Sequence, residues 1–156
     1  MGFTARAALD RVGPTASVVV VELVPAIVAW NRGPLAPLAG RPLDDPRVTL
    51  VVGDVVGYLA AGPAPFHAIL LDVDNGPDPV TARGNARLYE PAGLERIHRA
   101  LRPGGVLVVW SAYQAPAFPT TLRQAGFAPE VVRARSRGGK GGRHVLYVGR
   151  RTPARS

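Results

Sequence analysis

The sequence FHAILLDVDNGPD, residues 66–78, joins a short apolar run to a cluster of acids and turn residues. The apolar part, residues 68–71, has the length and the flanking residues of a strand buried on both faces of a parallel sheet. Ligands of open α/β sheets bind just beyond the carboxyl ends of such strands, which is where Asp72 and Asp74 stand. The same residue types form ordinary polar turns, but a carboxylate on the end of a buried strand needs a partner. We therefore interpret residues 72–78 as a functional loop.

Strands and helices alternate on both sides of this stretch. Apolar, β-branched runs predict strands at residues 17–23, 47–52, 66–71, 106–110, 130–134 and 144–148. Helices are predicted at residues 3–12, 25–31, 55–61, 91–101 and 119–125, with irregular connections at 35–46 and 81–89. Residues 136–142 are too few for a parallel crossover, so the last two strands must be antiparallel. The pattern predicts an α/β fold with a doubly wound, mostly parallel, Rossmann-like sheet and an antiparallel C-terminal hairpin.

Composition narrows the class of protein. The chain has 156 residues, 47% of them hydrophobic, which suits a single domain with a real core. It has no apolar run of the roughly 18 residues that a membrane span needs, and its first residues do not lead into a signal peptide, so we expect a cytoplasmic protein. The chain has no cysteine, and its three histidines lie far apart. This argues against a metal site.

The net charge of +8 lies entirely in residues 133–156, which hold seven Arg and Lys140 but no acid. A basic tail of this kind can bind polyanions. No basic patch interleaved with aromatic residues and no known nucleic-acid module accompanies it. Arg is used almost to the exclusion of Lys beside abundant Ala, Gly and Pro, which suggests a GC-rich coding sequence. We therefore do not expect nucleic acid to be the partner.

Three carboxylates, Glu22, Asp54 and Asp72, end or directly follow three successive predicted strands. A doubly wound sheet would bring them to one edge. An acid at such a strand end can accept hydrogen bonds from both hydroxyls of a ribose. Asp54 could accept from the amino group of a base, and Asp72 from a cationic or amine-bearing substrate atom. Each acid alone would also fit a helix cap or a solvated turn.

Segments along nearly the whole chain resemble, in order and spacing, the motifs of one family. They are residues 20–23 (VVEL), 52–55 (VGDV), 68–72 (AILLD) with its proline-containing loop, 101–107 (LRPGGVL) and 144–150 (HVLYVGR). They resemble those of the spermidine synthases, or polyamine aminopropyltransferases, and their relatives. This resemblance implies the class I S-adenosylmethionine-dependent methyltransferase fold, with residues 1–150 as the S-adenosylmethionine-binding domain and residues 151–156 as a basic tail.

The resemblance also implies a cofactor site for S-adenosylmethionine or its decarboxylated form. Glu22 would hold the ribose hydroxyls, and Asp54 and Val55 would hold the adenine. Gly2 would be the last residue of a glycine-rich loop that approaches the methionine part of the cofactor. Asp72 would lie beside the reacting end of the cofactor.

For the second substrate, the resemblance implies an amine acceptor that Asp72 orients and deprotonates. The family's loop reads like Asp-Ser-Ser-Asp-Pro, whereas here Asp72 is followed by Val73, Asp74 and Asn75. The position of the family's second acid is therefore taken by Asn75, or the acid has moved to Asp74 or Asp78. Asp74 and Asn75 are the expected specificity residues, and polyamine specificity is open. Tyr113 is a further candidate for the acceptor pocket, whereas Trp30, Tyr89 and Trp110 are interpreted as core or rim aromatics.

The chain also lacks features that the resemblance leads us to expect. The family's N-terminal β domain is absent, as are the first strand and most of the glycine-rich loop before the first helix. That strand would lie between the strands that end at Glu22 and Asp72. Without it these two strands would pair directly, leave a gap, or borrow a strand from a second copy in a homo-oligomer. We expect a truncated chain or a start codon assigned too far downstream.

Two other functions compete with an aminopropyl or methyl transferase. A non-catalytic remnant or binding module would use the basic tail to contact an acidic partner. An NAD-dependent dehydrogenase would account for the interval of 20 residues between Gly2 and Glu22, which a dinucleotide-binding fingerprint also shows. The terminal hairpin and the position of Asp72 argue against the dehydrogenase.

Overall fold

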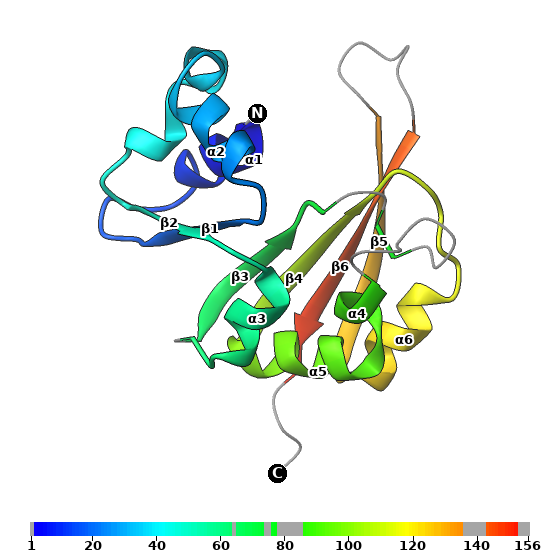
Figure 1. Ribbon diagram of the computed structural model, residues 1–156. Coiled ribbons are helices and arrows are strands. Elements are labelled where there is room, and N and C mark those ends of the chain that lie inside the picture. Colours follow the sequence, from blue (N-terminus) through cyan, green and yellow to red (C-terminus); the bar gives the residue numbers. More distant parts are fainter. Residues whose placement is uncertain (1, 64, 74–75, 78–85, 136–142, 153–156) are drawn as a thin grey trace. The chain divides into compact units, whose positions relative to one another are not determined.

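The computed structural model describes residues 2–63, 65–73, 76–77, 86–135 and 143–152 (Figure 1). The chain divides into two compact units, residues 1–58 and residues 59–156. Each unit is described by itself below. Asp74, Asn75 and Asp78 of the acidic loop lie outside the described residues, as does the predicted hairpin loop 136–142.

The first unit is built around two parallel strands, β1 (Val18–Glu22) and β2 (Val48–Val52). Helices α1 (Phe3–Leu9) and α2 (Pro25–Arg32) flank β1 in the chain. The expected connection at residues 35–46 contains two short 3-10 helices, η1 (Ala36–Ala39) and η2 (Pro42–Asp44), each with a proline in its first turn. Proline presets the backbone angle for such a turn, so a proline-rich connection becomes ordered without a longer helix.

Arg47 ties the start of β2 to the end of α1. Its guanidinium pairs with Asp45, with Nη2 2.8 Å from Oδ2 and Nε 2.9 Å from Oδ1. The Nη1 atom of Arg47 donates to the carbonyl oxygens of Leu9, Val12 and Gly13 at 3.2 to 3.3 Å. These bonds satisfy carbonyls at the C-terminal end of α1, where a helix leaves its acceptors without partners.

The second unit holds a four-stranded sheet in the order β3-β4-β6-β5. Its strands are β3 (Phe66–Leu71), β4 (Leu101–Ser111), β5 (Phe127–Arg135) and β6 (Arg143–Arg151). β3 and β4 are parallel, whereas β6 runs antiparallel to both β4 and β5. This confirms the α/β class and the antiparallel C-terminal hairpin.

Three helices, α4 (Ala86–Tyr89), α5 (Pro91–Ala100) and α6 (Phe118–Gln124), lie on one face of this sheet (Figure 1). Alternate residues of β4 on that face are fully buried, as are residues of α5 and α6 that pack in the same core. They are Leu101, Leu107, Val109 and Ser111 from the strand and Leu94, Ile97 and Leu122 from the helices. Helix α3 (Val55–Ala60) crosses the boundary between the two units.

The expectation that residues 68–71 are buried on both faces is wrong. Leu70 is 46% exposed, and Ala68 on the same face of β3 is also exposed. The reason is that α4, α5 and α6 all lie on the other face of this sheet. Residues of β1 are half-buried along their whole length rather than fully covered.

The strands of the two units form separate sheets. Among the described residues, β1 pairs with β2 in the first unit, and β3 pairs with β4 in the second. β6 ends at Arg151, one residue beyond the expected domain border.

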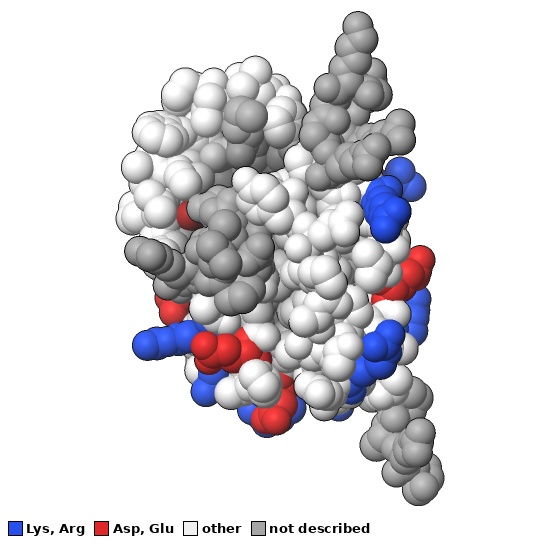
Figure 2. Space-filling model, turned by 90° about the vertical axis from the view of Figure 1, so that its right-hand side faces the viewer, with Lys and Arg blue, Asp and Glu red and all other residues white. Residues whose placement is uncertain are grey.

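Within the described ranges, no helix has the length and apolar character needed to cross a membrane. The same residues contain no cluster of three or more histidine, cysteine, aspartate or glutamate side chains placed to hold a metal ion. Figure 2 shows arginine and acidic side chains close together on the lower part of one face. Among the described residues, charges of both signs therefore mix on this face.

Candidate functional site

Glu22 and Asp54 lie at the same end of the two-stranded sheet. Glu22 is the last residue of β1 and stands opposite Val52, the last residue of β2. The ladder continues for one more bond, from the amide of Gly53 to the carbonyl oxygen of Glu22 at 2.9 Å. Because β1 and β2 are parallel, Glu22 and Asp54 lie at one edge of this sheet. The predicted edge also included Asp72, which belongs to the second unit.

Both carboxylates also stabilise the turn that follows their strand. Oε1 of Glu22 accepts a hydrogen bond from the amide of Val24 at 2.9 Å. Oδ1 of Asp54 accepts from the amide of Val56 at 3.1 Å, next to Val55 at the start of α3. A carboxylate has two oxygens and about four acceptor positions. These bonds orient the two side chains. Each carboxylate keeps further acceptor positions, which could accept a hydrogen bond from a hydroxyl or an amino group of a ligand.

Gly2 has a structural reason to be glycine. Its φ is 73°, in the left-handed region, and a Cβ atom there would lie 2.9 Å from Cγ of Pro42 and 3.4 Å from Oδ1 of Asn31. Its carbonyl oxygen accepts from the amide of Arg6 at the start of α1. Packing against Pro42 and Asn31 therefore accounts for this residue before any contact with a cofactor is considered.

Asp72 follows β3 directly and is exposed. The loop then returns to the sheet, where Gly76 and Pro77 are both buried. Gly76 lies against Ser111, the last residue of β4, so closely that a Cβ atom on Gly76 would be 2.8 Å from the Cα atom of Ser111. The loop after Asp72 is thus anchored to the end of the neighbouring strand.

Ser111 also sets the path of the chain after β4. Its Oγ donates to the carbonyl oxygen of Tyr113 at 2.7 Å and accepts from the amide of Tyr113 at 3.4 Å. The Tyr113 side chain is 56% exposed. It is not one of the residues that line the pocket described next, although its neighbours Gln114 and Ala115 are.

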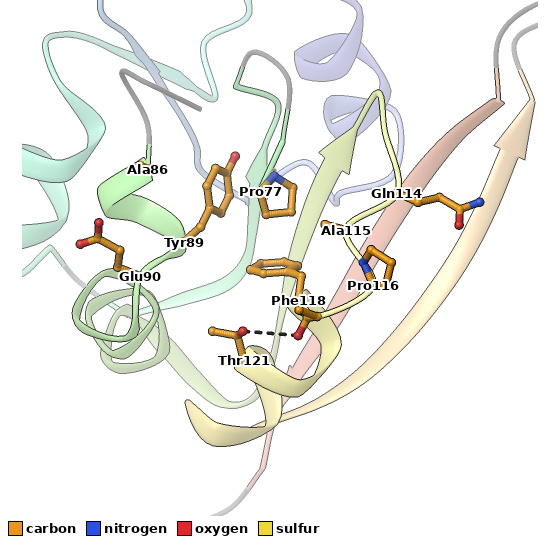
Figure 3. Close-up of a pocket in the computed structure, with 10 residues that line it drawn as sticks. Pro77, Ala86, Tyr89, Glu90, Gln114, Ala115, Pro116, Phe118 and Thr121 are labelled. Atoms are coloured by element: carbon orange, nitrogen blue, oxygen red, sulfur yellow. Dashed lines mark hydrogen bonds between the residues drawn. The ribbon is translucent and has the colours of Figure 1, made fainter. Parts of the chain in front are cut away.

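A pocket of about 390 Å³ opens in the second unit beside Pro77 (Figure 3). Its walls come from the loop after β3, from α4 and the start of α5, and from the β4–α6 connection. They are formed by Pro77, Ala86, Tyr89, Glu90, Gln114, Ala115, Pro116, Ala117, Phe118 and Thr121. Figure 3 shows the Tyr89 and Phe118 rings close to Pro77, while the carboxylate of Glu90 and the amide of Gln114 point away from them.

Tyr89, interpreted from the sequence as a core or rim aromatic, is a buried residue of the pocket wall. Its side chain is 7% exposed, and its ring meets the Phe118 ring edge-on at a centroid distance of 5.7 Å. The hydroxyl of Tyr147, the next ring in this cluster, accepts from the amide of Ala115 at 2.6 Å. The hydroxyl of Tyr89, in contrast, is buried and has no hydrogen-bond partner among the described residues.

Tyr89 is electrostatically linked to Asp72. Burial of the phenol, and secondly the negative charge of Asp72, raise the pKa of Tyr89. The hydroxyl therefore stays protonated at neutral pH and keeps its donor hydrogen. The sequence alone gave little reason to single out Tyr89. A buried tyrosine can serve as a packing residue just as a phenylalanine does, and the surroundings of its hydroxyl are known only from the structure.

The structure thus groups the candidate residues within each unit. In the first unit it places Glu22 and Asp54 at one sheet edge, with Val55 directly after Asp54. In the second, Asp72 directly follows β3, and Pro77 of the loop after it lines the pocket together with Tyr89. Each group presents carboxylates at strand ends, an arrangement that can bind hydroxyl, amino or ammonium groups.

No family model matches the chain. Similar sequences include a polyamine aminopropyltransferase of Mycobacterium tuberculosis, 35% identical over 136 residues, which span 81% of this chain and 25% of that protein. Putrescine N-methyltransferase 4 of Nicotiana tabacum is 38% identical over 90 residues, which span 56% of this chain and 22% of that protein. The chain therefore spans about a quarter of the length of these relatives.

Solved structures share the fold. A spermidine synthase in complex with the transition state analogue AdoDATO superposes with a TM-score of 0.76 at 18% identity, covering 96% of this chain and 51% of that one. The S-adenosylmethionine-dependent methyltransferase SibL superposes with a TM-score of 0.61 at 20% identity, covering 97% of this chain and 48% of that one. At these identities the likeness concerns the fold.

Proposed function

Because this chain is homologous to part of the polyamine aminopropyltransferases and has the fold of class I S-adenosylmethionine-dependent methyltransferases, we propose that it is a transferase acting on an amine. It would use S-adenosylmethionine or decarboxylated S-adenosylmethionine and transfer a methyl or an aminopropyl group. The observation that carries the proposal is the position of Glu22, Asp54 and Asp72 at the carboxyl ends of β1, β2 and β3. Such strand ends are where α/β sheets bind ligands.

The first unit would hold the nucleoside part of the cofactor. Glu22, oriented by its bond to the amide of Val24, would accept hydrogen bonds from both ribose hydroxyls. Asp54, held by the amide of Val56, would accept from the amino group of adenine, and Val55 would pack against the base. Gly2 keeps a supporting role in this proposal through the turn that it makes before α1.

Asp72 would act as the general base. When bound, the cofactor would supply a sulfonium whose neighbouring carbon can be attacked in line with the carbon–sulfur bond, with the electrons of that bond leaving on sulfur. Asp72 would accept a proton from the ammonium form of the acceptor, which would free the lone pair of the nitrogen for that attack. Such a reaction depends mainly on positioning and on a desolvated amine.

The acceptor is an amine in this proposal because the relatives are named for polyamines and putrescine. Asp74 and Asn75, which follow Asp72 in the sequence, and Tyr113 remain candidates for contacts with that amine. The cofactor domain of a cytoplasmic enzyme would run to Arg151, where β6 ends. The residues after it would be a tail without a part in the chemistry.

A titration of the purified chain tests the proposal. The ligands are S-adenosylmethionine, its decarboxylated form, NADH and a DNA oligonucleotide, each followed by calorimetry. Saturable binding of either of the first two alone supports the transferase, and their relative affinity indicates a methyl or an aminopropyl transfer. Binding of NADH alone would support a dehydrogenase instead. Salt-sensitive binding of DNA alone would support a non-catalytic binding module.

A variant pair assigns the binding to the proposed strand ends. Glu22→Gln keeps the size of the side chain but removes the negative charge that would hold the ribose hydroxyls. We expect about tenfold weaker cofactor binding from the loss of charge-assisted hydrogen bonds. Glu95→Gln, an exposed substitution on α5, is the matched control and should leave the affinity unchanged.

A further inference from the structure

A second pocket, of about 280 Å³, lies in the second unit between the segment that leads from α3 into β3 and the last turns of α5. Figure 1 shows α5 along the lower edge of the four-stranded sheet. The apolar part of the pocket wall is formed by Leu59, Ala60, Pro63 and Ala100. Arg96 and Arg99 supply the charged part. The pocket therefore combines an apolar wall with two guanidinium groups.

The two arginines can reach one ligand together. Arg96 and Arg99 are three residues apart on α5, so their side chains leave the same face of the helix, with Cβ atoms about 5 to 6 Å apart. Arg96 is half-buried, whereas Arg99 is exposed. Two cations this close repel each other, and an anion between them removes the repulsion. The planar guanidinium matches the oxygen atoms of a carboxylate or a phosphate.

Carboxylates of the described residues do not take this place. The ion pairs within the described ranges all lie in the first unit and join Arg6 to Asp10, Arg41 to Asp44 and Arg47 to Asp45. Glu95 adjoins Arg96 on α5 and is exposed, and it makes none of these pairs. The two acids outside the described residues, Asp74 and Asp78, come after the opposite end of β3 in the chain. The two guanidinium groups are thus available to a ligand.

The end of α5 does not by itself explain the two arginines. Cationic side chains are common in the last turn of a helix, because they meet its free carbonyl oxygens. Here Arg151 of β6 donates to the carbonyl oxygens of His98 and Leu101, at 2.9 Å in the first case. A residue far along the chain therefore already provides this contact at the end of α5.

We propose that this second pocket binds a phosphate group, with Arg96 and Arg99 on its oxygen atoms and Leu59 and Pro63 against an apolar body attached to it. The inference goes beyond the proposed transferase and does not depend on it. A phosphate ester carries close to two negative charges at neutral pH, so it balances two guanidinium groups better than a single carboxylate does.

The phosphate site is separate from the proposed transfer site. The segment at residues 59–63 precedes β3, whereas Asp72 follows it. β3 has six residues, which at about 3.3 Å per residue makes the strand ~20 Å long. A small ligand in the second pocket would therefore not touch the acid at the end of β3, and the two sites can be tested independently.

Direct binding to the full chain tests the ligand class. The probes are inorganic phosphate, phenyl phosphate and benzoate, each followed by calorimetry in the same low-chloride buffer at about pH 7.5, where phosphate carries close to two charges. We expect phenyl phosphate to bind about tenfold more tightly than benzoate, because it has the larger charge. No saturable binding of either phosphate, or tighter binding of benzoate, would overturn the inference.

The same titration distinguishes the two sources of a phosphate group. An ester with an apolar body should bind about threefold to tenfold more tightly than the free ion, because its body is buried against the apolar wall. Tighter binding of phenyl phosphate would therefore identify a phosphate ester as the ligand. Equal affinities would identify the free ion. Either result supports the phosphate site.

Replacing the arginines one at a time assigns the binding to the pocket. Arg96→Gln and Arg99→Gln should each weaken binding of phenyl phosphate by about tenfold. Arg123→Gln is the matched control, because Arg123 is an exposed arginine in the last turn of α6 and does not line the pocket. Equal losses in all three variants would show a general effect of net charge and overturn the inference.

A carboxylate built into the wall should compete with the ligand. Ala60→Glu places an acid beside the two guanidinium groups, so we expect binding of phenyl phosphate to fall by at least about tenfold. Ala61→Glu is the matched control, since Ala61 is the exposed neighbour of Ala60 and does not line the pocket. Similar losses from both substitutions would place the phosphate elsewhere and overturn the inference.

Cofactor binding provides the readout that separates this site from the proposed function. Arg96→Gln and Arg99→Gln should bind S-adenosylmethionine as the wild type does. If they lose the cofactor together with the phosphate, the arginines belong to the cofactor site and the inference fails. If the chain binds no cofactor at all but the phosphate results hold, the inference stands and the transferase proposal fails.

Discussion

Gly76 lies directly against Ser111 where the loop after Asp72 meets the end of β4, so that Ser111 occupies the space of a Gly76 side chain. A side chain on Gly76 would collide with the Oγ and Cβ atoms of Ser111 and would come within 2.8 Å of its Cα atom. Gly76 also has a φ of 71°, which favours glycine. This contact fixes where the acidic loop returns to the sheet, and so it positions Pro77 at the pocket.

Gly76→Ala should therefore destabilise the chain more than its backbone angle alone requires. The left-handed conformation costs alanine about 1 to 2 kcal/mol, and the collision with Ser111 adds to this. Gly104→Ala is the matched control, because Gly104 has a φ of 76° and a Cβ atom added there would meet no atom within 4 Å. Urea denaturation should give a larger loss for Gly76→Ala; equal losses would mean that the contact with Ser111 is unimportant.

The pairing of Arg47 with Asp45 predicts a dependence on acid pH. Hydrogen bonds from the side chain and the amide of Arg47 lower the pKa of Asp45 from 3.8 to about 2. A lowered carboxyl pKa stabilises the fold above pH 3.8, and this contribution is lost as the pH falls toward 2. Asp45→Asn should lower stability at about pH 5 and flatten the fall between about pH 4 and pH 2, measured by urea denaturation at each pH.

Asp44→Asn serves as the control for this prediction. Asp44 pairs with Arg41 at 3.5 Å, and both side chains are 56% exposed. Exposed pairs of this kind contribute little to stability. A fall of the same steepness in the Asp45→Asn variant and the wild type would contradict the role given to Asp45.

The elements that the sequence predicted well are those whose boundaries are local. β3 runs from Phe66 to Leu71 as expected, because an apolar run is enclosed by proline and an acidic turn. α5 begins at Pro91 and ends at Ala100, close to the prediction, because proline suits its first turn. The strand-end position of Asp72 follows from β3 in the same way.

The sequence did not predict, or predicted too short, the elements whose extent depends on partners far away in the chain. β5 begins at Phe127, before the expected Glu130, and includes Pro129. β5 pairs with β6 on one side only and is therefore an edge strand of its sheet. Proline is tolerated in an edge strand, because its missing amide hydrogen can face away from the neighbouring strand. Residues 86–89, expected to be irregular, form α4, and its Tyr89 became a site candidate only once burial and the neighbours of its hydroxyl were known.

His98 predicts a second, milder dependence on pH. Burial, and then the positive charges of Arg151 and Arg99, lower the pKa of His98 from 6.5, although a hydrogen bond with Gly126 opposes the shift. The folded chain therefore binds this proton less readily than the unfolded chain does. With respect to His98, the folded chain therefore has its full stability above pH 6.5 and loses stability as the pH falls below that value.

His98→Gln should remove this component, so that the melting temperature changes less between about pH 7.5 and pH 5. His67→Gln is the control, since His67 is an exposed residue of β3 that contacts Arg102. We expect the His67 variant to keep the dependence of the wild type. An identical pH profile for His98→Gln and the wild type would refute the assignment.

Replacement of Asp72 tests the central claim, that the acid at the end of β3 is the base of an amine transferase. In Asp72→Asn, turnover of an amine with S-adenosylmethionine or its decarboxylated form should fall by about a hundredfold or more, because the amide cannot accept the proton. Cofactor affinity, measured by calorimetry on the same sample, should retain most of its strength. Asp44→Asn should behave as the wild type. Unchanged turnover in Asp72→Asn would contradict the account.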